Sequence, residues 1–234
     1  MEESTPHPAT RGRFIVLEGI DGAGTTTQLK ALEAHFARAG RKGVFTHQPS
    51  DGPVGMLIRL ALHGRLVGAN HASHEDAGAA PTAAPERVDA ETLALLFAAD
   101  RADHVATQVR PNLARGRHVV CDRYLLSTLA YQGLDADVEW LLSINRPAPA
   151  PDLTLFLDLP AELAAERMRR ARWRKDVYED EAQQRAIRAR YLELLERRIP
   201  AVGPVVTIDA SAEVGEVTAR VVEAVERVIG SESG

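Results

Sequence analysis

The stretch "RFIVLEGIDGAGTTTQ", residues 13–28, decides the fold, because it combines a short apolar run, a glycine-rich turn and the start of an amphipathic segment. Three successive apolar residues at its start are typical of a strand buried on both faces of a parallel sheet. Gly19 and Gly24 have the spacing of the phosphate-loop pattern G-x-x-x-x-G-K-[ST]. The stretch therefore predicts an anion-binding loop between a buried strand and a helix.

The loop departs from its pattern at one position. Thr25 stands where the pattern has lysine, whereas Thr26 fills the Ser/Thr position. The glycine-rich backbone and the positive end of the following helix still favour an anion, and the Thr26 hydroxyl can ligate Mg²⁺. What is lost is a positive charge near the β- and γ-phosphates. We therefore expect phosphate binding, with the charge supplied from elsewhere or the loop catalytically impaired.

Composition narrows the class of protein. The chain has 234 residues and a net charge of -5, which suits one soluble domain and argues weakly against a nucleic-acid partner. Of the 28 basic residues 25 are arginines, so arginine must do most of the work on any phosphate. The single cysteine, Cys121, permits no internal disulfide and suits a reducing cytoplasm. No apolar run approaches the roughly 20 residues that span a bilayer.

Strand-like and helix-like segments alternate along the chain. We interpret residues 1–12 as a disordered tail, residues 13–230 as a single domain, and residues 67–89 as a flexible insertion without apolar periodicity. The predicted strands cover residues 13–18, 43–48, a segment centred on 119–121, 152–159 and 204–209. The predicted helices cover residues 26–39, 90–115 (with a break at Pro111), 125–145, 161–174, 179–198 and 211–229, the last capped by Ser211.

This alternation predicts an α/β fold, with a five-stranded parallel sheet and helices on both faces. In such sheets ligands bind beyond the carboxyl ends of the strands. Segments 19–27, 48–55 and 122–131 all follow predicted strand ends. We therefore expect these three segments to form the functional edge.

"LLFAADRADH", residues 95–104, places Phe97 and Arg101 four residues apart on one helix face. An aromatic ring and a guanidinium on one face can stack on a nucleobase and bond its edge. Spacing alone favours a plainer interpretation, in which Phe97 belongs to the core and Arg101 to the surface.

"CDRYLLSTLAYQG", residues 121–133, begins just past a predicted strand. Asp122 can order Mg²⁺ and its waters there, and Arg123 can clamp a phosphate bidentately. The alternative is a helix cap with a neighbouring ion pair, but the position at the functional edge favours a site.

"ERMRRARWRKDVYEDE", residues 166–181, carries an unusually dense run of positive charge. Such a run is usually a solvated helix face. It can also close over a polyphosphate, so we interpret residues 166–180 as an arginine-rich lid.

"FIVLEGIDGAGTTTQ", "LLFAADRADH", "DRYLLSTLAYQG" and "PDLTLFLDL", in this order, resemble the thymidylate kinase family over residues 13–208. The resemblance implies a P-loop kinase fold and transfer of the ATP γ-phosphoryl group to dTMP, giving dTDP for dTTP synthesis. It also implies Mg²⁺ as cofactor and a homodimer, without a nucleic-acid or membrane partner.

The resemblance also implies residue roles. The ATP phosphates would be held by Gly19, Ile20, Asp21, Gly22, Ala23, Gly24, Thr25, Thr26 and Thr27, and the metal by Thr26 and Asp122. The dTMP site would comprise Asp21, Phe97, Arg101, Arg123, Ser127, Thr128, Tyr131 (crowding the sugar 2′ position) and Tyr178. The catalytic residues would be Asp21, Arg123, Arg169, Arg172 and Arg174.

Two departures from the family pattern leave alternatives open. Thr25 replaces lysine, and His47 and Gln48 replace charged residues after the second predicted strand. We hypothesise that Arg169, Arg172 or Arg174 of the lid supplies the missing charge. The alternatives are a catalytically impaired nucleotide-binding protein and a kinase for another deoxynucleoside or its monophosphate, including dUMP, which differs from dTMP by one methyl group.

Overall fold

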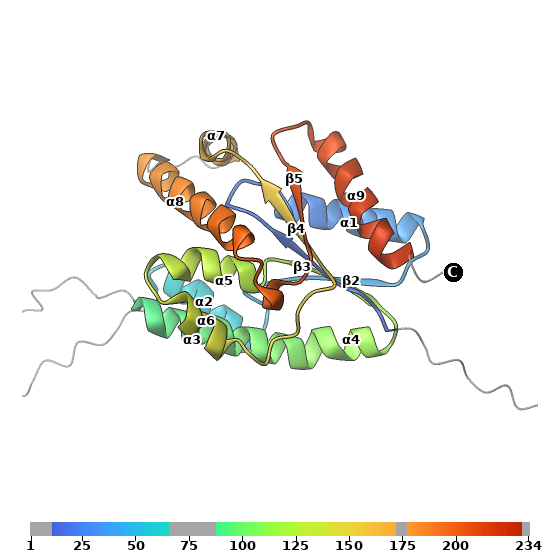
Figure 1. Cartoon of the computed structure of the whole chain (residues 1–234), viewed down its shortest axis with the longest axis horizontal. Coiled ribbons are helices and arrows are strands. Elements are labelled where there is room, and N and C mark those ends of the chain that lie inside the picture. Colours follow the sequence, from blue (N-terminus) through green and yellow to red (C-terminus); the bar gives the residue numbers. More distant parts are fainter. Residues whose placement is uncertain (1–10, 66–87, 172–176, 231–234) are drawn as a thin grey trace, which may run out of the picture.

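The computed structural model describes residues 11–65, 88–171 and 177–230. Its centre is a five-stranded sheet in which every neighbouring pair is parallel, in the order β2-β3-β1-β4-β5 (Figure 1). The predicted α/β fold is therefore confirmed. The strands are β1 (Phe14–Glu18), β2 (Gly43–His47), β3 (His118–Asp122), β4 (Leu153–Asp158) and β5 (Val205–Asp209).

Helices cover both faces of this sheet (Figure 1). One face carries α1 (Thr25–Arg38) and α9 (Val214–Gly230). The other face carries α2 (Pro53–Leu62), α3 (Ala90–His104), α4 (Arg110–Ala114), α5 (Leu125–Tyr131) and α6 (Val138–Ile144). The pair α7 (Ala161–Ala171) and α8 (Val177–Glu196) completes the fold, and α8 packs along α5. In the described ranges no helix is long and apolar enough to cross a bilayer.

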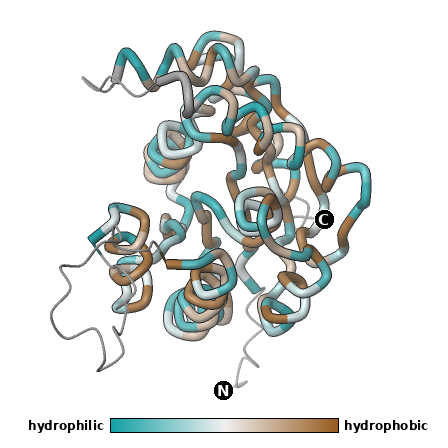
Figure 2. The backbone as a smooth tube through the Cα atoms, turned by 90° about the vertical axis from the view of Figure 1, so that its left-hand side faces the viewer, coloured by the Kyte–Doolittle hydropathy of each residue, from teal (hydrophilic) through white to brown (hydrophobic). Residues whose placement is uncertain are grey.

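The core lies between the sheet and its helices. All five residues of β1 are buried, which explains the unbroken apolar run that identified the strand. Leu32 and Phe36 of α1 and Val221 and Val225 of α9 are buried over the same face of the sheet. Figure 2 shows hydrophobic and hydrophilic segments alternating along the helices, as expected for helices with one buried face.

Two of the helix predictions were wrong about where a helix is interrupted. The helix over 90–115 is not broken at Pro111, because a π-helical turn, Val105–Val109, carries α3 into α4. In this wider turn the backbone N–H of Arg110 bonds the Val105 carbonyl, which relieves the clash that a proline ring makes in a regular α-helix. The segment 125–145 is two helices instead of one, joined by a 3₁₀ turn at Gln132–Leu134 and restarted by the Asp137 cap.

Smaller differences concern helix ends and termini. Ser211 does not cap α9, because its N–H and hydroxyl both bond the Asp209 carboxylate and the helix begins three residues later. The helix α2, which starts with proline at its first turn, was not predicted. The predicted tail lies outside the described residues except for Arg11 and Gly12, and Arg11 pairs with Asp152 at 2.7 Å. The predicted insertion, 67–89, also lies outside them up to residue 87.

The topology creates a crevice beside the central strand. Because β1 lies between β3 and β4, the chain leaves β1 toward the β2 side and leaves β4 toward the β5 side. This reversal is the position where α/β sheets bind ligands, beyond the carboxyl ends of the strands. The glycine-rich loop directly after Glu18 lies in this crevice, and Asp122 ends the neighbouring strand in register with Leu17.

Candidate active site

A first cavity, of about 460 Å³, lies over the glycine-rich loop and the beginning of α1. Gly22 (φ 84°) and Gly24 (φ 97°) adopt left-handed backbone conformations that suit glycine. A Cβ on Gly22 would also lie 2.8 Å from the Ala164 carbonyl oxygen, so the loop packs tightly under α7. Of the residues predicted to hold ATP, those from Asp21 to Thr27 line this cavity, whereas Ile20 is buried beneath the loop.

Thr26 and Asp122 meet at the edge of this cavity. The Thr26 hydroxyl donates to Asp122 Oδ2 at 2.6 Å. Asp122 is 6% exposed, and within the described ranges its other oxygen, Oδ1, has no hydrogen-bond partner. The described residues contain no cluster of three or more His, Cys, Asp or Glu that could hold a metal ion. A hydroxyl beside a carboxylate with a free oxygen nevertheless fits Mg²⁺, which binds few protein ligands and keeps phosphates and waters.

The missing lysine has no single replacement in the loop. Thr25 is buried, and Arg123 and Arg167 are the cationic side chains of the described ranges that line the first cavity. Arg167 on α7 donates to the Ala210 carbonyl at 2.9 Å, and sequence analysis did not predict its position. Of the predicted lid arginines, Arg169 is exposed on α7. Arg172 and Arg174 lie outside the described residues, as does the side chain of Tyr178.

A second cavity, of about 320 Å³, lies between α3, α5 and α8. Besides Asp21 and Arg123, its walls bring together five further residues predicted for the monophosphate site, Phe97, Arg101, Ser127, Thr128 and Tyr131. The first pair comes from one face of α3 and the others from α5, which follows β3 at the functional edge. Gln48, Pro49 and Gln184 also line it and were not singled out as site residues.

Arg101 is the most constrained cation of the second cavity, with 1% of its surface exposed. The plainer interpretation, a surface arginine, is therefore wrong. Its Nε donates to Gln48 Oε1 at 3.1 Å and its Nη2 to Thr128 Oγ1 at 2.8 Å and the Tyr124 carbonyl at 3.0 Å, while Nη1 donates to Asn145 Oδ1. Of the five N–H groups of a guanidinium, these bonds leave one on Nη1 without a partner among the described residues.

Asp21 and Arg123 line both cavities. Arg123 Nη2 donates to Asp21 Oδ1 at 2.7 Å, and its Nη1 donates to the Gly19 carbonyl at 2.9 Å. The Arg123 guanidinium carbon also lies 5.1 Å from the centre of the Tyr131 ring. The backbone of Arg123 is left-handed (φ 68°), which is uncommon for a residue with a side chain and typical of functional sites. The wall between the two cavities is thus a charge pair held by the loop on one side and α5 on the other.

Glu18, which sequence analysis missed, connects this wall to the core. It is fully buried and accepts hydrogen bonds from the backbone N–H groups of Tyr124 and Ser127, from the Ser127 hydroxyl (2.5 Å) and from the Tyr191 hydroxyl (3.0 Å). Burial raises its pKa, while these bonds and the nearby charge of Arg123 act in the opposite direction. A carboxylate at the end of an otherwise apolar strand was the available signal.

The chain is similar to known proteins over most of its length. The family model described as thymidylate kinase matches residues 17–76 and 81–221. A "Probable thymidylate kinase" of Pyrococcus abyssi is 42% identical over 80% of this chain and 84% of its own length. One of Thermococcus kodakarensis is 38% identical over 94% of this chain and its whole length.

A "Thymidylate kinase" of Pelotomaculum thermopropionicum is 42% identical over 80% of this chain and 82% of its own length. The residues matched by the family model include those that line both cavities. The chain belongs to the thymidylate kinase family.

Proposed function

We propose that this protein transfers the γ-phosphoryl group of ATP to dTMP, giving dTDP. The observation that best supports this proposal is that two neighbouring cavities share Asp21 and Arg123. A phosphoryl transfer needs donor and acceptor phosphates placed in line, with charge stabilisation between them. Two neighbouring cavities that share a carboxylate and a guanidinium support that arrangement, with one nucleotide in each. The alternatives, an impaired binding protein or a kinase for another nucleoside, are not favoured by the names of the relatives.

On the donor side, the loop from Gly19 to Thr27 would hold the ATP phosphates with its backbone N–H groups and the positive end of α1. Thr26 and the free Oδ1 of Asp122 would hold Mg²⁺. When bound, that ion would neutralise phosphate charge. Asp21 and Arg123 would lie where the transferred group passes, and Arg123 would grip the phosphate of the monophosphate.

On the acceptor side, Phe97 would stack on the base and Arg101 would bond its edge. One Nη1 N–H of Arg101 remains for a ligand, and an N–H requires an acceptor. Thymine and uracil present an oxygen at position 4, whereas cytosine presents an amino donor there. The described contacts thus support a 4-oxo pyrimidine. Tyr131 would lie against the sugar, and Thr128 and Ser127 would fix the position of Arg101 and the boundary wall.

The charge that Thr25 lacks would come from the lid, as the sequence suggested. Arg169 is exposed on α7, the helix that covers the loop, so its guanidinium is free to turn toward a polyphosphate. If this is so, Arg169→Ala, Arg172→Ala or Arg174→Ala should lower kcat about tenfold or more, and Thr25→Lys should restore the lost activity. Unchanged kcat in all three variants would reject the lid hypothesis while leaving the function itself untouched. Family resemblance also supports a homodimer and a cytoplasmic location.

The first experiment is a coupled ADP-release assay with ATP and Mg²⁺, comparing dTMP, dUMP, dCMP, dGMP and thymidine. We expect turnover with dTMP, a kcat/KM for dUMP lower by roughly 10–200-fold because one methyl group is missing, and little turnover with dCMP or dGMP. Turnover with thymidine but not with dTMP would reject the proposed acceptor. Binding of ATP and dTMP without turnover would favour the impaired-loop alternative.

A further inference from the structure

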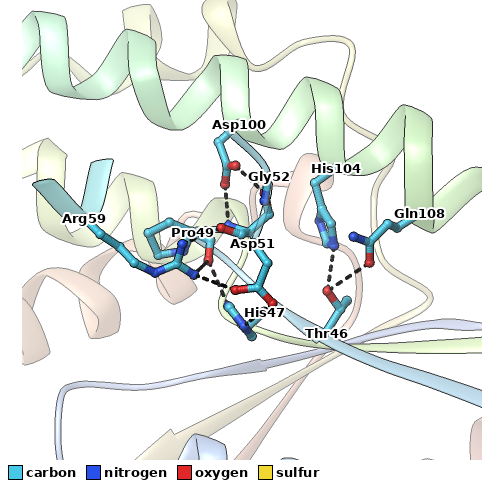
Figure 3. Close-up of polar contacts among 10 residues, drawn as sticks. Thr46, His47, Pro49, Asp51, Gly52, Arg59, Asp100, His104 and Gln108 are labelled. Carbon is cyan, nitrogen blue, oxygen red and sulfur yellow. Dashed lines mark hydrogen bonds and ion pairs between the residues drawn. The ribbon is translucent and has the colours of Figure 1, made fainter. Parts of the chain in front are cut away.

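A chain of polar groups leads away from Arg101, and its members beyond Arg101 have no role in the function proposed above. It joins Arg101 to Gln48, Gln48 to His104, His104 to Thr46, and Thr46 to Gln108. Gln48 and His104 are 5% and 1% exposed, so loss of these contacts would leave buried polar atoms without a hydrogen-bond partner and would cost free energy. Figure 3 shows the His104 imidazole directed at Thr46, with Gln108 of the following π-turn beside it.

The direction of every bond in this chain follows from Arg101. A guanidinium only donates, so the Gln48 atom 3.1 Å from Arg101 Nε must be the amide oxygen. The amide nitrogen of Gln48 therefore faces His104 Nδ1, 3.1 Å away, and must donate to it. Nδ1 is then the unprotonated ring nitrogen, and the proton is on Nε2, which lies 2.8 Å from Thr46 Oγ1. The Thr46 hydroxyl in turn donates toward Gln108, at a long 3.5 Å.

This direction requires a neutral His104. Burial lowers the pKa of His104, and the charges around it partly cancel. Asp100 and Asp103 on its own helix act to raise the pKa, whereas Arg101 on that helix and His47 on β2 act to lower it. The imidazole is thus uncharged near neutral pH and offers Nδ1 as an acceptor.

We propose that His104 and Gln48 are positioning residues for base recognition, because the acceptor at His104 Nδ1 satisfies the Gln48 amide nitrogen and so holds the amide oxygen in the position that Arg101 requires. With the oxygen toward Arg101, the guanidinium keeps the orientation that leaves one Nη1 N–H for the base. With the amide reversed, two donors face each other at Nε, and the guanidinium must turn away from that orientation. This proposal rests on the proposed function only in that a 4-oxo pyrimidine monophosphate occupies the second cavity.

The test compares two replacements of His104 by steady-state kinetics. His104→Phe keeps a planar ring without an acceptor, whereas His104→Asn can place an amide oxygen close to the position of Nδ1. We expect His104→Phe to raise the KM for dTMP about tenfold, with kcat and the KM for ATP little changed, and His104→Asn to stay within about twofold of the unmodified protein. His35→Phe is the control, because His35 bonds Glu226 on α9, away from both cavities, and should affect stability alone.

The same His104 substitution made in a Gln48→Glu variant distinguishes a positioning role of His104 from a packing role. In Gln48→Glu both side-chain oxygens accept, so Arg101 Nε has an acceptor whichever way the group is turned. His104→Phe should therefore raise the KM for dTMP much less in the Gln48→Glu background than in the unmodified protein. An equal rise in both backgrounds, a His104→Asn variant as impaired as His104→Phe, or an unchanged KM in His104→Phe would each overturn the proposal.

The pH dependence gives an independent readout. Burial lowers the pKa of His104 below the ordinary imidazole value of 6.5, so protonation removes the Nδ1 acceptor only as pH falls through that lowered pKa. The ratio of the KM for dTMP in the unmodified protein to that in His104→Asn should therefore rise, and ionisation of dTMP itself cancels in this ratio. A ratio that falls as pH is lowered would overturn the proposal, because loss of the Nδ1 acceptor can only weaken dTMP binding in the unmodified protein. Failure of the unmodified protein to phosphorylate dTMP at all would instead reject the proposed function.

Discussion

The two cavities of this protein differ in how the residues that line them are distributed along the sequence. The first cavity, called the donor cavity below, takes one continuous segment, residues 21–28, from the loop and the beginning of α1, and its other walls from Arg123, α7, α9 and the segment after β5. The acceptor cavity is formed by side chains from α3, α5, α8 and the segment after β2, which are far apart in the sequence. Backbone N–H groups accept almost any phosphate, whereas a set of side chains with fixed directions can distinguish one base from another.

If the proposed function is correct, this difference would let the loop tolerate its substitution. Replacing lysine by Thr25 leaves the backbone cradle intact, and a charge on another element can approach the same phosphates. The acceptor cavity has no such freedom, because four N–H groups of Arg101 are already committed to neutral partners. We therefore expect donor-side changes to lower kcat and acceptor-side changes to raise the KM for dTMP.

A substitution of Arg123, which lines both cavities, should impair both sides of the site together and cause the largest loss of activity. Arg123→Met removes the guanidinium that bonds Asp21 and the Gly19 carbonyl and that would bind the acceptor phosphate. We expect kcat/KM for dTMP to fall roughly a thousandfold, because a charge-stabilising group and a positioning group are lost together. ATP binding, measured by calorimetry, should change little. Arg123→Lys should recover only part of the loss, since an ammonium keeps the charge but lacks the planar fork of donors that a guanidinium presents.

The contiguous half of the site could be predicted from the sequence, because a strand, a glycine turn and a helix are adjacent in the chain. The spacing of Phe97 and Arg101 also gave their common helix face correctly. It could not show that Arg101 is buried, since burial depends on Gln48, Asn145 and Thr128 from three other segments. Arginine is usually exposed, but the tertiary contacts of Arg101 bury it.

Glu18 and Pro111 illustrate two further limits. A carboxylate at a strand end suggests solvent or a ligand, yet Glu18 accepts bonds from groups that come into reach only when α5 and α8 pack over β1. Pro111 suggests a helix break, yet the π-turn before it joins α3 to α4, and α4 packs against β3. Pattern reasoning treats each segment separately, so outcomes set between segments escape it.

A donor-side change should lower kcat alone. Thr26→Ala removes the hydroxyl that bonds Asp122 and would hold Mg²⁺. We expect kcat to fall on the order of a hundredfold and the Mg²⁺ concentration for half-maximal rate to rise, with the KM for dTMP near that of the unmodified protein. Thr218→Ala on α9, where the hydroxyl bonds its own helix, is the matched threonine control. A large rise in the KM for dTMP would show that the two cavities are not separable in this way.

An acceptor-side change should have the opposite signature. Phe97→Ala removes the ring that would stack on the base, a contact whose typical value of about 1–3 kcal/mol corresponds to a rise of tenfold or more in the KM for dTMP. The kcat and the KM for ATP should change little. Leu95→Ala, an exposed position on the same helix, controls for the loss of an apolar side chain on α3. Equal loss of affinity for ATP and dTMP would contradict the assignment of Phe97 to one cavity.

The smallest effect should come from Glu18, which lies behind both cavities and touches neither nucleotide site directly. Glu18→Gln keeps an acceptor oxygen for the N–H groups of Tyr124 and Ser127, so kcat/KM should fall less than about tenfold. Its signature is the pH dependence of stability. Because burial raises the pKa of Glu18, the folded protein holds this proton more tightly than the unfolded chain does.

The contribution of Glu18 to the free energy of unfolding should therefore decrease as pH rises from the ordinary glutamate pKa of 4.5 through the raised folded value, and this contribution should be absent in Glu18→Gln. Urea denaturation between pH 4.5 and pH 7.5 measures both proteins, and the difference between them should shift in favour of Glu18→Gln as pH rises. Parallel curves would mean that Glu18 is ionised as easily in the folded protein as in the unfolded chain. In that case the hydrogen bonds from α5 and α8 would offset the whole cost of burying the charge, and the wall between the two cavities would rest on a fully stabilised carboxylate.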